Sequence, residues 1–374
     1  MKKKVSDILT IFLFFGFLFV VAGLYLLMPM ENFSEKEKRV LAEPPELSVE
    51  TLTSGQWGSA VESYLADHVP GRDFFVGVNA YYDLYSGRQV TKDVYLAEDD
   101  RLVQAPYVED QERITKNMGI INRFADKVGI QVDLMIIPSA GFVLEDSILG
   151  IHNPYNDDAI IKNIYAQAGT HVTGVDALSA MTSAENPNGL YYRTDHHWTA
   201  YGAYRVYEAY MNLKQKEYPA PGDFTKEAHD GFLGSTYSSA GLWQIPGEKV
   251  ELWKTDTQFT VTNSESDQVH NGLFYEERLE ELDKYTVYLD GNHGLVTIHN
   301  PDGEGKGHLL VIRDSYANCL GTFLANSYET VTLVDLRYYK KEVSKLPNFE
   351  EFTDILVCYS IGNFLTDANI GWLR

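Results

Sequence analysis

Hydrophobic residues recur along the chain in two patterns, the spacing of an amphipathic helix and the unbroken run of a buried strand. Residues 114–128 carry apolar side chains at helical intervals, and Gly129 follows them as a suitable C-terminal cap. Continuous apolar runs bounded by polar or turn residues occur at 132–138, 309–312, 330–334 and 355–359. Helices that alternate with such strands predict an α/β domain whose mostly parallel sheet is covered by helices.

Two more helices are expected beside polar residues. Thr199 is a plausible N-cap for a helix with apolar positions from Ala203 to Met211, and residues 316–324 form an amphipathic segment directly after a predicted strand. Residues 219–300 are richer in Gly, Ser, Thr and aromatic side chains and show weaker periodicity. We therefore expect loops and short strands there.

The amino-terminal segment has the pattern of a membrane anchor. Residues 8–30 are mainly apolar and long enough to cross a bilayer as a helix, and Lys2, Lys3 and Lys4 precede them. The positive-inside tendency predicts a cytoplasmic amino terminus and an extracytoplasmic remainder. A cleaved signal peptide is the alternative, but residues 24–29 lack an A-x-A-like site. We predict a single-pass protein of the cell membrane.

A short arm separates this segment from the main domain. Residues 31–39 are rich in charged side chains, and adjacent prolines within 41–47 exclude a continuous helix. Two helices are predicted at 57–65 and 74–85, around a turn at 69–73. The predicted organisation is a cytoplasmic tip and transmembrane anchor (1–30), a stalk with packing helices (31–95), and a catalytic domain (96–374) that contains the irregular insert (219–300).

Composition narrows the possible ligands. The hydrophobic fraction of 44% is that of a globular protein, and the net charge of −22 argues against nucleic acid, because phosphate binding needs clustered Lys and Arg. A neutral or weakly charged substrate fits better. The two cysteines, Cys319 and Cys358, lie in apolar segments, where buried free thiols are expected, although one disulfide remains possible.

A carboxylate, an imidazole and a hydroxyl form the candidate catalytic set. Asp195 precedes His197 by two positions, and alternation in an extended segment would point both side chains the same way and His196 elsewhere. Ser315 follows the run 309–312 and precedes a predicted helix, whose amides could stabilise an oxyanion at the carboxyl edge of the sheet. These residues predict a Ser-His-Asp nucleophilic centre. The alternative for Ser315 is a simple N-cap.

Metal binding is the alternative for the Asp195, His196 and His197 cluster. Adjacent residues seldom aim at one ion, and the other histidines show no recognisable ligand spacing. We therefore predict no metal and no other cofactor.

The string DHHW at 195–198, followed by Thr199, Tyr201 and Gly202, resembles the signature of the DHHW proteins, which are similar to the alginate O-acetyltransferases and their SGNH-hydrolase-like fold. The likeness covers most of the chain beyond the anchor. Its further blocks are 35–47, 64–73, 290–292, 312–316 and 335–337. Alginate itself is not implied, because no carbohydrate-binding module follows and Ser139, Ala140 and Gly141 replace a lysine-containing string.

The resemblance implies roles for individual residues. Ser315 would be the nucleophile, His197 the base and Asp195 its orienting carboxylate. Four further residues are candidates for oxyanion or substrate binding, namely Gly291, Asn292, Asn318 and Arg313. Trp198 is expected to hold the Asp-x-His segment in place.

These features together predict an extracytoplasmic O-acetyltransferase that modifies a cell-surface or exported polysaccharide. The resemblance implies that a membrane-bound O-acyltransferase supplies the acetyl group. Water as the second nucleophile would instead give a carbohydrate O-acetylesterase. A non-catalytic glycan-binding scaffold of an envelope biosynthesis complex is the third possibility.

Overall fold

The computed structural model of the protein describes residues 2–27, 30–88 and 90–373. The chain divides into two compact units. The first contains Met1–Lys92 and Ser238–Gln244, and the second contains Asp93–Tyr237 and Ile245–Arg374.

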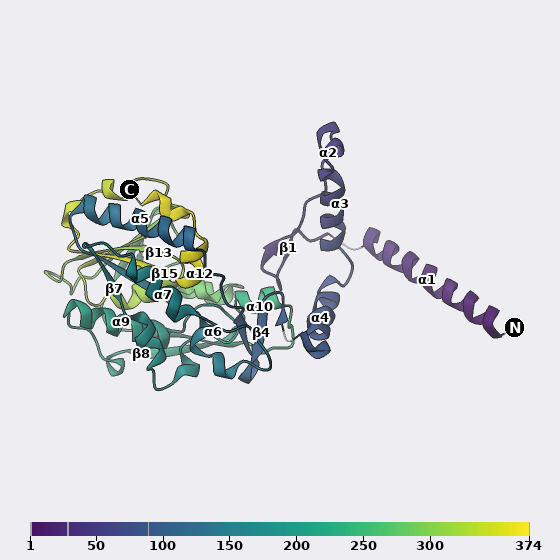
Figure 1. Ribbon diagram of the computed structural model, residues 1–374, viewed down its shortest axis with the longest axis horizontal. Coiled ribbons are helices and arrows are strands. Elements are labelled where there is room, and N and C mark those ends of the chain that lie inside the picture. Colours follow the sequence, from purple (N-terminus) through teal and green to yellow (C-terminus); the bar gives the residue numbers. More distant parts are fainter. Residues whose placement is uncertain (1, 28–29, 89, 374) are drawn as a thin grey trace. The chain divides into compact units, whose positions relative to one another are not determined.

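The first unit begins with helix α1 (Lys2–Leu27) (Figure 1). Its segment Ser6–Tyr25 has a mean hydropathy of 2.5 and is not buried, so it is long and apolar enough to cross a membrane. The predicted apolar helix is therefore present. Met28 and Pro29, near the end of the predicted span, lie outside the described residues.

Among the described residues up to Thr91, three α-helices and three short strands follow α1. The helices predicted on either side of the 69–73 turn are present as α3 and α4. The elements are β1 (Phe33–Ser34), β2 (Arg39–Val40), α2 (Val49–Thr53), α3 (Gln56–Asp67), α4 (Arg72–Asp83) and β3 (Val90–Thr91).

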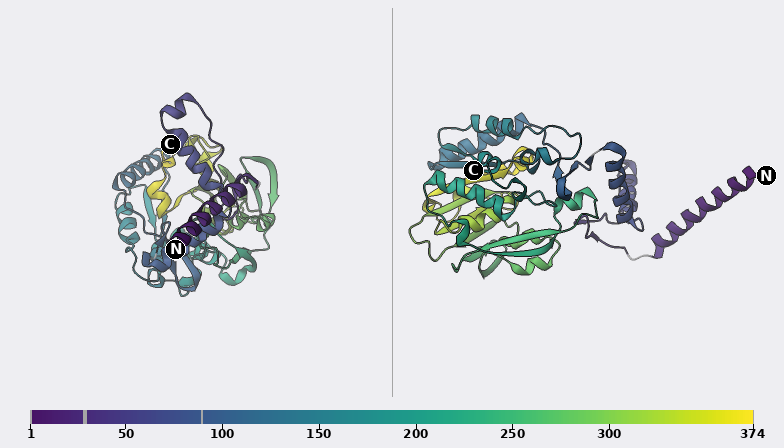
Figure 2. Two further views of the ribbon diagram at one scale, coloured as in Figure 1. Left: turned by 90° about the vertical axis from the view of Figure 1, so that its right-hand side faces the viewer. Right: turned by 90° about the horizontal axis from the view of Figure 1, so that it is seen from below.

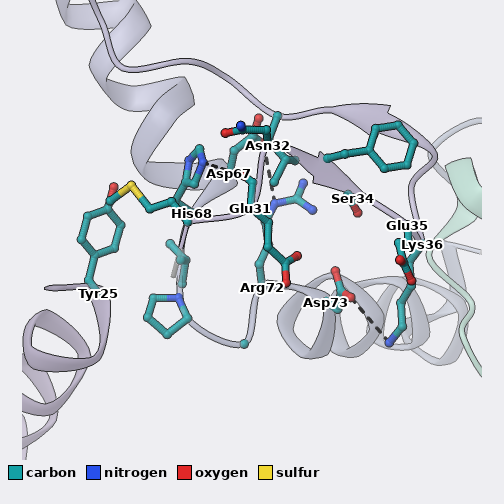
Figure 3. A pocket seen from close by; sticks show the side chains of 16 residues that line it. Tyr25, Glu31, Asn32, Ser34, Glu35, Lys36, Asp67, His68, Arg72 and Asp73 are labelled. Atoms are coloured by element: carbon teal, nitrogen blue, oxygen red, sulfur yellow. Dashed lines mark hydrogen bonds and ion pairs between the residues drawn. The ribbon is translucent and has the colours of Figure 1, made fainter. Parts of the chain in front are cut away.

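The first unit also holds a cavity of about 760 Å³ (Figure 3). Ion pairs hold the chain segments around it together: Arg39 pairs with Asp67, and Arg72 Nη1 lies 2.7 Å from Glu37 Oε2. None of the predicted site residues lines this cavity.

The second unit is built on one mixed sheet, in which eight strands are found within the described chain, in the order β11-β10-β12-β14-β13-β15-β6-β7. The five strands from β14 to β7 are parallel to one another, and the others are antiparallel. Their bounds are β6 (Val132–Ile137), β7 (Val172–Val175), β10 (Thr260–Asn263), β11 (Ser266–Asn271), β12 (Leu295–His299), β13 (His308–Arg313), β14 (Thr330–Val334) and β15 (Asp354–Ser360). The predicted mostly parallel sheet is confirmed.

Helices cover both faces of this sheet (Figures 1 and 2). Strand β13 shows why: Leu309 and Val311 pack in one buried cluster with α8, α9 and α11, and Leu310 and Ile312 pack in the other with α5, α7 and α12. The helices are α5 (Gln111–Val128), α6 (Ala140–Val143), α7 (Asp157–Ala166), α8 (Ala177–Thr182), α9 (Ala200–Lys214), α11 (Tyr316–Leu324) and α12 (Ile361–Thr366).

The segment 219–300 contributes more to the core than its weak periodicity suggested. It supplies β10, β11 and β12 to the main sheet, together with an antiparallel pair, β8 (Thr225–Phe232) and β9 (Glu248–Lys254). Helix α10 (Ser235–Ala240) lies between β8 and β9 in the sequence, and β4 (Val94–Ala97) and β5 (Arg101–Gln104) form a hairpin near the start of the second unit.

Candidate active site

Ser315 lies between the carboxyl end of β13 and the start of α11. Its backbone is already helical, and its side chain makes no capping hydrogen bond to α11. The Oγ atom instead lies 2.7 Å from Nε2 of His197, and the residue is 7% exposed. The simple N-cap alternative is therefore wrong.

His197 contacts a partner through each ring nitrogen. Nδ1 lies 2.5 Å from Oδ1 of Asp195, and Nε2 faces Ser315. A carboxylate can only accept, so Nδ1 carries the proton and Nε2 is left to accept from the Ser315 hydroxyl. The ring of Tyr285 stacks on the imidazole at 3.9 Å with an interplanar angle of 10°, which fixes the plane of the ring.

The loop that carries Asp195 and His197 differs from the extended segment that the sequence predicted. Tyr191 and Trp198 form an isolated antiparallel bridge, and the residues between them bend. Oδ1 of Asp195 accepts from the backbone N–H of His197 at 2.9 Å as well as from its ring. The two side chains therefore meet through a local bend closed by a carboxylate, which is a common role of Asp.

His196 does not point elsewhere, so that expectation is wrong. Because the loop bends, its ring lies 3.9 Å from the ring of His197, and its Nδ1 lies 2.5 Å from Oγ of Ser235. Burial, followed by the repulsion that a protonated His197 would exert, lowers the pKa of His196 to about 4. His196 is consequently neutral at pH 7.

Asp195 is held as a carboxylate. Its Oδ2 accepts from the backbone N–H of Ser235 at 2.6 Å and from the Ser235 hydroxyl at 2.9 Å. Burial by itself would raise the pKa of Asp195, but the two neighbouring histidines and these hydrogen bonds outweigh burial and hold the pKa well below its usual range. An ionised Asp195 can stabilise a positive charge on His197.

Asp195, His196 and His197 lie close enough to share a metal ion, with ligand atoms within 4.8 Å of one another. Both carboxylate oxygens, however, already accept from N–H and O–H donors, and an ion would have to displace those donors. The arrangement fits an oriented imidazole better, and the absence of a metal stays a prediction.

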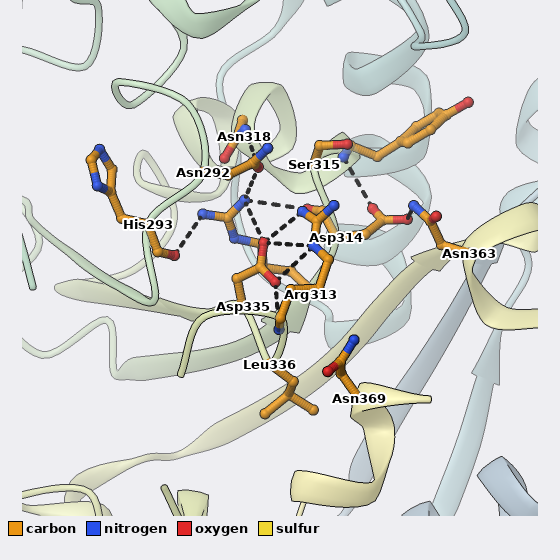
Figure 4. A network of polar contacts seen from close by, with 12 residues as sticks. Asn292, His293, Arg313, Asp314, Ser315, Asn318, Asp335, Leu336, Asn363 and Asn369 are labelled. Carbon is orange, nitrogen blue, oxygen red and sulfur yellow. Dashed lines mark hydrogen bonds and ion pairs between the residues drawn. The ribbon is translucent and has the colours of Figure 1, made fainter. Parts of the chain in front are cut away.

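Asp314 joins the turn that carries Ser315 to the neighbouring strand (Figure 4). Its Oδ1 accepts from the backbone N–H of Tyr316 at 3.0 Å, and its Oδ2 accepts from the backbone N–H and hydroxyl of Ser360, each at 2.8 Å. Asn363 Nδ2 donates to the same oxygen at 2.8 Å. Ser315 therefore lies on a turn fixed by a buried carboxylate.

Three of the four predicted oxyanion or substrate residues come together. Oδ1 of Asn292 accepts from Arg313 Nη1 at 2.9 Å and from Asn318 Nδ2 at 3.1 Å (Figure 4). Arg313 is fully buried beside Asp335 and therefore has no contact with solvent. Its role in the site is to hold the side chain of Asn292. Gly291 has a φ of +78°, and its N–H bonds the Tyr288 carbonyl, so its place is in the turn that precedes Asn292.

Trp198 has the structural role predicted for it. The side chain is fully buried, and its Nε1 donates to the carbonyl of Tyr316 at 3.1 Å. This bond joins the Asp195 and His197 loop to the first turn of α11, directly after Ser315. The catalytic roles of Ser315 and the other predicted site residues stay predictions.

The sequence did not reveal three residues that shape the site: Ser235, Tyr285 and Asp314. Ser235 and Tyr285 lie in the 219–300 segment, far in sequence from the histidines they contact. Asp314 was visible as the neighbour of the candidate serine, and an acidic residue at a strand-to-helix turn is a recognisable capping signal.

Comparison with known proteins shows the family of this chain. The sequence profile of the DHHW protein family matches residues 106–334, more than half of the chain. The chain therefore belongs to the DHHW protein family. No curated protein sequence matches the chain.

Among the solved structures similar to this chain, a DHHW family protein and PatB1 share its fold. A DHHW family protein from Eubacterium siraeum is 21% identical, with a TM-score of 0.66 over 76% of this chain and 95% of that one. PatB1 of Bacillus cereus with a sulfonyl adduct is 20% identical, with a TM-score of 0.62 over 75% and 98% of the two chains. The O-acetyltransferase domain of Pseudomonas putida AlgJ is 15% identical, with a TM-score of 0.44 over 73% and 92%.

Proposed function

We propose that the protein is an extracytoplasmic O-acetyltransferase that modifies a cell-surface or exported polysaccharide through an acetyl-serine intermediate. The observation that carries this proposal is the continuous Ser315, His197 and Asp195 relay, with heavy-atom separations of 2.7 Å and 2.5 Å in a buried site. The resemblance of several sequence blocks to those of the DHHW proteins and the alginate O-acetyltransferases supports acetyl as the group transferred. The exposed apolar helix α1 supports a membrane anchor.

The first half-reaction would load the enzyme. Ser315 Oγ attacks the acetyl carbonyl carbon while its proton passes to Nε2 of His197, and Asp195 stabilises the imidazolium through Nδ1. The tetrahedral oxyanion collapses as the donor oxygen takes the proton from Nε2 and leaves. Acetyl-Ser315 and a neutral His197 remain, and the membrane-bound O-acyltransferase is the proposed source of the acetyl group.

The second half-reaction would use the same base. A sugar hydroxyl loses its proton to Nε2 as its oxygen attacks the acetyl carbonyl carbon, and the bond to Ser315 Oγ then breaks while Oγ regains the proton. Asn292 is the proposed oxyanion donor. Because Arg313 and Asn318 both donate to its Oδ1, the amide is held in one orientation, with Nδ2 left to donate.

A sulfonyl fluoride and an activated acetyl ester together test this function. PatB1 has been determined with a sulfonyl adduct, which makes this reagent a suitable probe of the serine. We expect one adduct on Ser315, located by peptide mass spectrometry, and acetyl transfer from 4-nitrophenyl acetate to an oligosaccharide that stops in parallel with labelling. Ser315→Ala should show neither. Acetyl transfer that persists in Ser315→Ala would refute the serine mechanism.

The same assay separates the alternatives. Release of acetate that added oligosaccharide does not divert indicates an esterase. If the wild-type protein shows neither acetyl transfer nor acetate release but binds glycan, it is a non-catalytic scaffold.

A further inference from the structure

A second pocket, outside the Ser315 centre, has the chemistry of an anion site. It measures about 410 Å³ and lies entirely within the second unit. Arg101 of β5, Thr199 and Tyr201 at the start of α9, and Lys226 and Trp253 of the β8 and β9 pair are among the residues that line it. The start of the 15-residue helix α9 adds the positive end of a helix dipole to the same wall.

Arg101 is a buried guanidinium that faces this pocket without a carboxylate partner. It is 4% exposed, and its Nη1 and Nη2 donate to three backbone carbonyls, those of Tyr191, Tyr192 and Asn188, at 2.7–3.0 Å. In the described chain no carboxylate forms an ion pair with it. Glu248 and Asp99 act on this charge from a distance, but its direct hydrogen bonds all go to neutral carbonyls. A buried charge without a directly bonded counter-ion is costly, and an anion in the pocket would supply one.

Lys226 supplies a second cation at the rim. Its Nζ lies 3.5 Å from the centre of the Trp253 ring, and the ion pairs found among the described residues do not include it. Arg193 and Lys249 also line the pocket, against the carboxylates of Glu248 and Glu251. Glu248 is already bonded to the backbone N–H groups of Arg193 and Thr194, and Glu251 accepts from the Trp253 indole.

The local charge is therefore opposite to that of the whole chain. Four basic and two acidic side chains line the pocket, whereas the chain has 31 basic and 53 acidic residues. Net charge alone favoured a neutral or weakly charged ligand. The ring of Tyr201 and the exposed Asn186 and Asn188 give the same pocket groups that suit a sugar.

We propose that this pocket binds an oxyanion group, carboxylate or phosphate, carried by a saccharide chain, with Arg101 at its base and Lys226 at its rim. The pocket is also lined by Tyr191, Tyr192 and Arg193, which precede Asp195 in the sequence. A bound saccharide chain would therefore contact the loop that carries Asp195 and His197. The proposal specifies an acidic acceptor and in that respect rests on the proposed function.

Calorimetric titration of the full-length chain in detergent tests this site without turnover. The probes are a galacturonate oligomer for carboxylate, a glycerol phosphate oligomer for phosphate, and a neutral cello-oligosaccharide of matched length. We expect at least one acidic oligomer to bind, with an affinity that falls as salt rises, and the neutral one to bind at least about tenfold more weakly. The acidic oligomer that binds with the higher affinity identifies the natural oxyanion as carboxylate or phosphate.

Lys226→Glu should weaken acidic binding at least about tenfold, because it reverses a charge at the rim. Lys116→Glu on α5 is the matched control, since Lys116 is exposed and makes the same charge change outside the pocket; it should bind as the wild type does. Arg101→Gln also removes the bonds that hold residues 188–192, so Lys226 gives the cleaner test.

Equal binding of neutral and acidic oligomers, no binding of any oligomer, or unchanged affinity in Lys226→Glu would overturn the proposal. Ser315→Ala should bind like the wild type, because the pocket does not contain Ser315. Acidic binding with no acetyl transfer would leave this site intact while refuting the proposed function. Acetyl transfer by a protein that binds no acidic oligomer would refute this site and leave the proposed function intact.

Discussion

At the scale of single residues, Asp195 is the group whose protonation and hydrogen bonds set the state of His197. Asp195→Asn would remove the negative charge and could present an N–H to Nδ1, which favours the wrong imidazole tautomer. We expect kcat to fall by up to about ten-thousandfold with the fold retained. Steady-state acetyl transfer and circular dichroism measure the two effects. An Asn variant with near wild-type kcat would exclude this role.

His196 separates the serine mechanism from a metal mechanism. Because its ring bonds Ser235 and is neutral at pH 7, His196→Ala should keep most acetyl transfer, and prolonged treatment with EDTA should change nothing. Activity assays before and after dialysis against the chelator decide the matter. Activity lost on chelation and restored by a divalent ion, together with an inactive His196→Ala, would indicate a metal centre.

His196 also makes stability depend on pH. Its native pKa of about 4 lies below the value of 6.5 expected when unfolded, so the unfolded chain binds this proton more readily and stability falls as pH drops from 6.5 towards 4. The expected loss is about 2 kcal/mol by pH 4.5. His196→Gln should lose less stability over this window in urea unfolding. Equal pH slopes in both proteins would contradict the prediction.

At the scale of elements, the turn before α10 has no room for a side chain beside Asp195. A Cβ at Gly234 would overlap the Asp195 side chain, whereas a Cβ at Gly222 has no neighbour within 4 Å. Gly234→Ala should therefore lower acetyl transfer at least about tenfold and destabilise the fold by about 1–3 kcal/mol. Gly222→Ala is the matched control. Full activity in Gly234→Ala would show that the position of Asp195 does not depend on this turn.

The elements that the sequence predicted well are those with strong local signals. Helix α5 ends at Gly129 with a φ of +68°, and Thr199 caps α9 through a side-chain bond to the N–H of Gly202. The buried strands β6, β13, β14 and β15 appeared as apolar runs because helices cover both of their faces. The pairing of Ser315 with His197 followed from their place beside one sheet and from the family resemblance.

The features that the sequence missed depend on contacts between distant segments. Ser235 reaches Asp195, and Tyr285 reaches His197, only after the 219–300 segment has folded over the loop. The bend at 191–198 was missed because its Asp195 bond to the His197 amide competes with extended backbone, and alternation alone does not reveal that competition.

At the scale of the whole molecule, the proposed topology follows from α1 and its basic flank. We expect the full-length chain to stay in the membrane fraction after carbonate washing, and added protease to digest it in intact protoplasts. A chain that begins at Glu31 should be soluble and should keep its reaction with the sulfonyl fluoride. Protection of the chain in protoplasts, or release of a mature form that begins near residue 29, would contradict the anchored orientation.

The two cysteines have a practical consequence for work on the intact protein. Cys319 and Cys358 are both free and fully buried, and burial raises the pKa of each thiol above its usual range. We therefore expect that the folded chain does not react with maleimides. A cysteine introduced at an exposed position would be the reactive thiol of the folded protein, so a spin label or fluorophore can be placed on the native background without first replacing either buried residue.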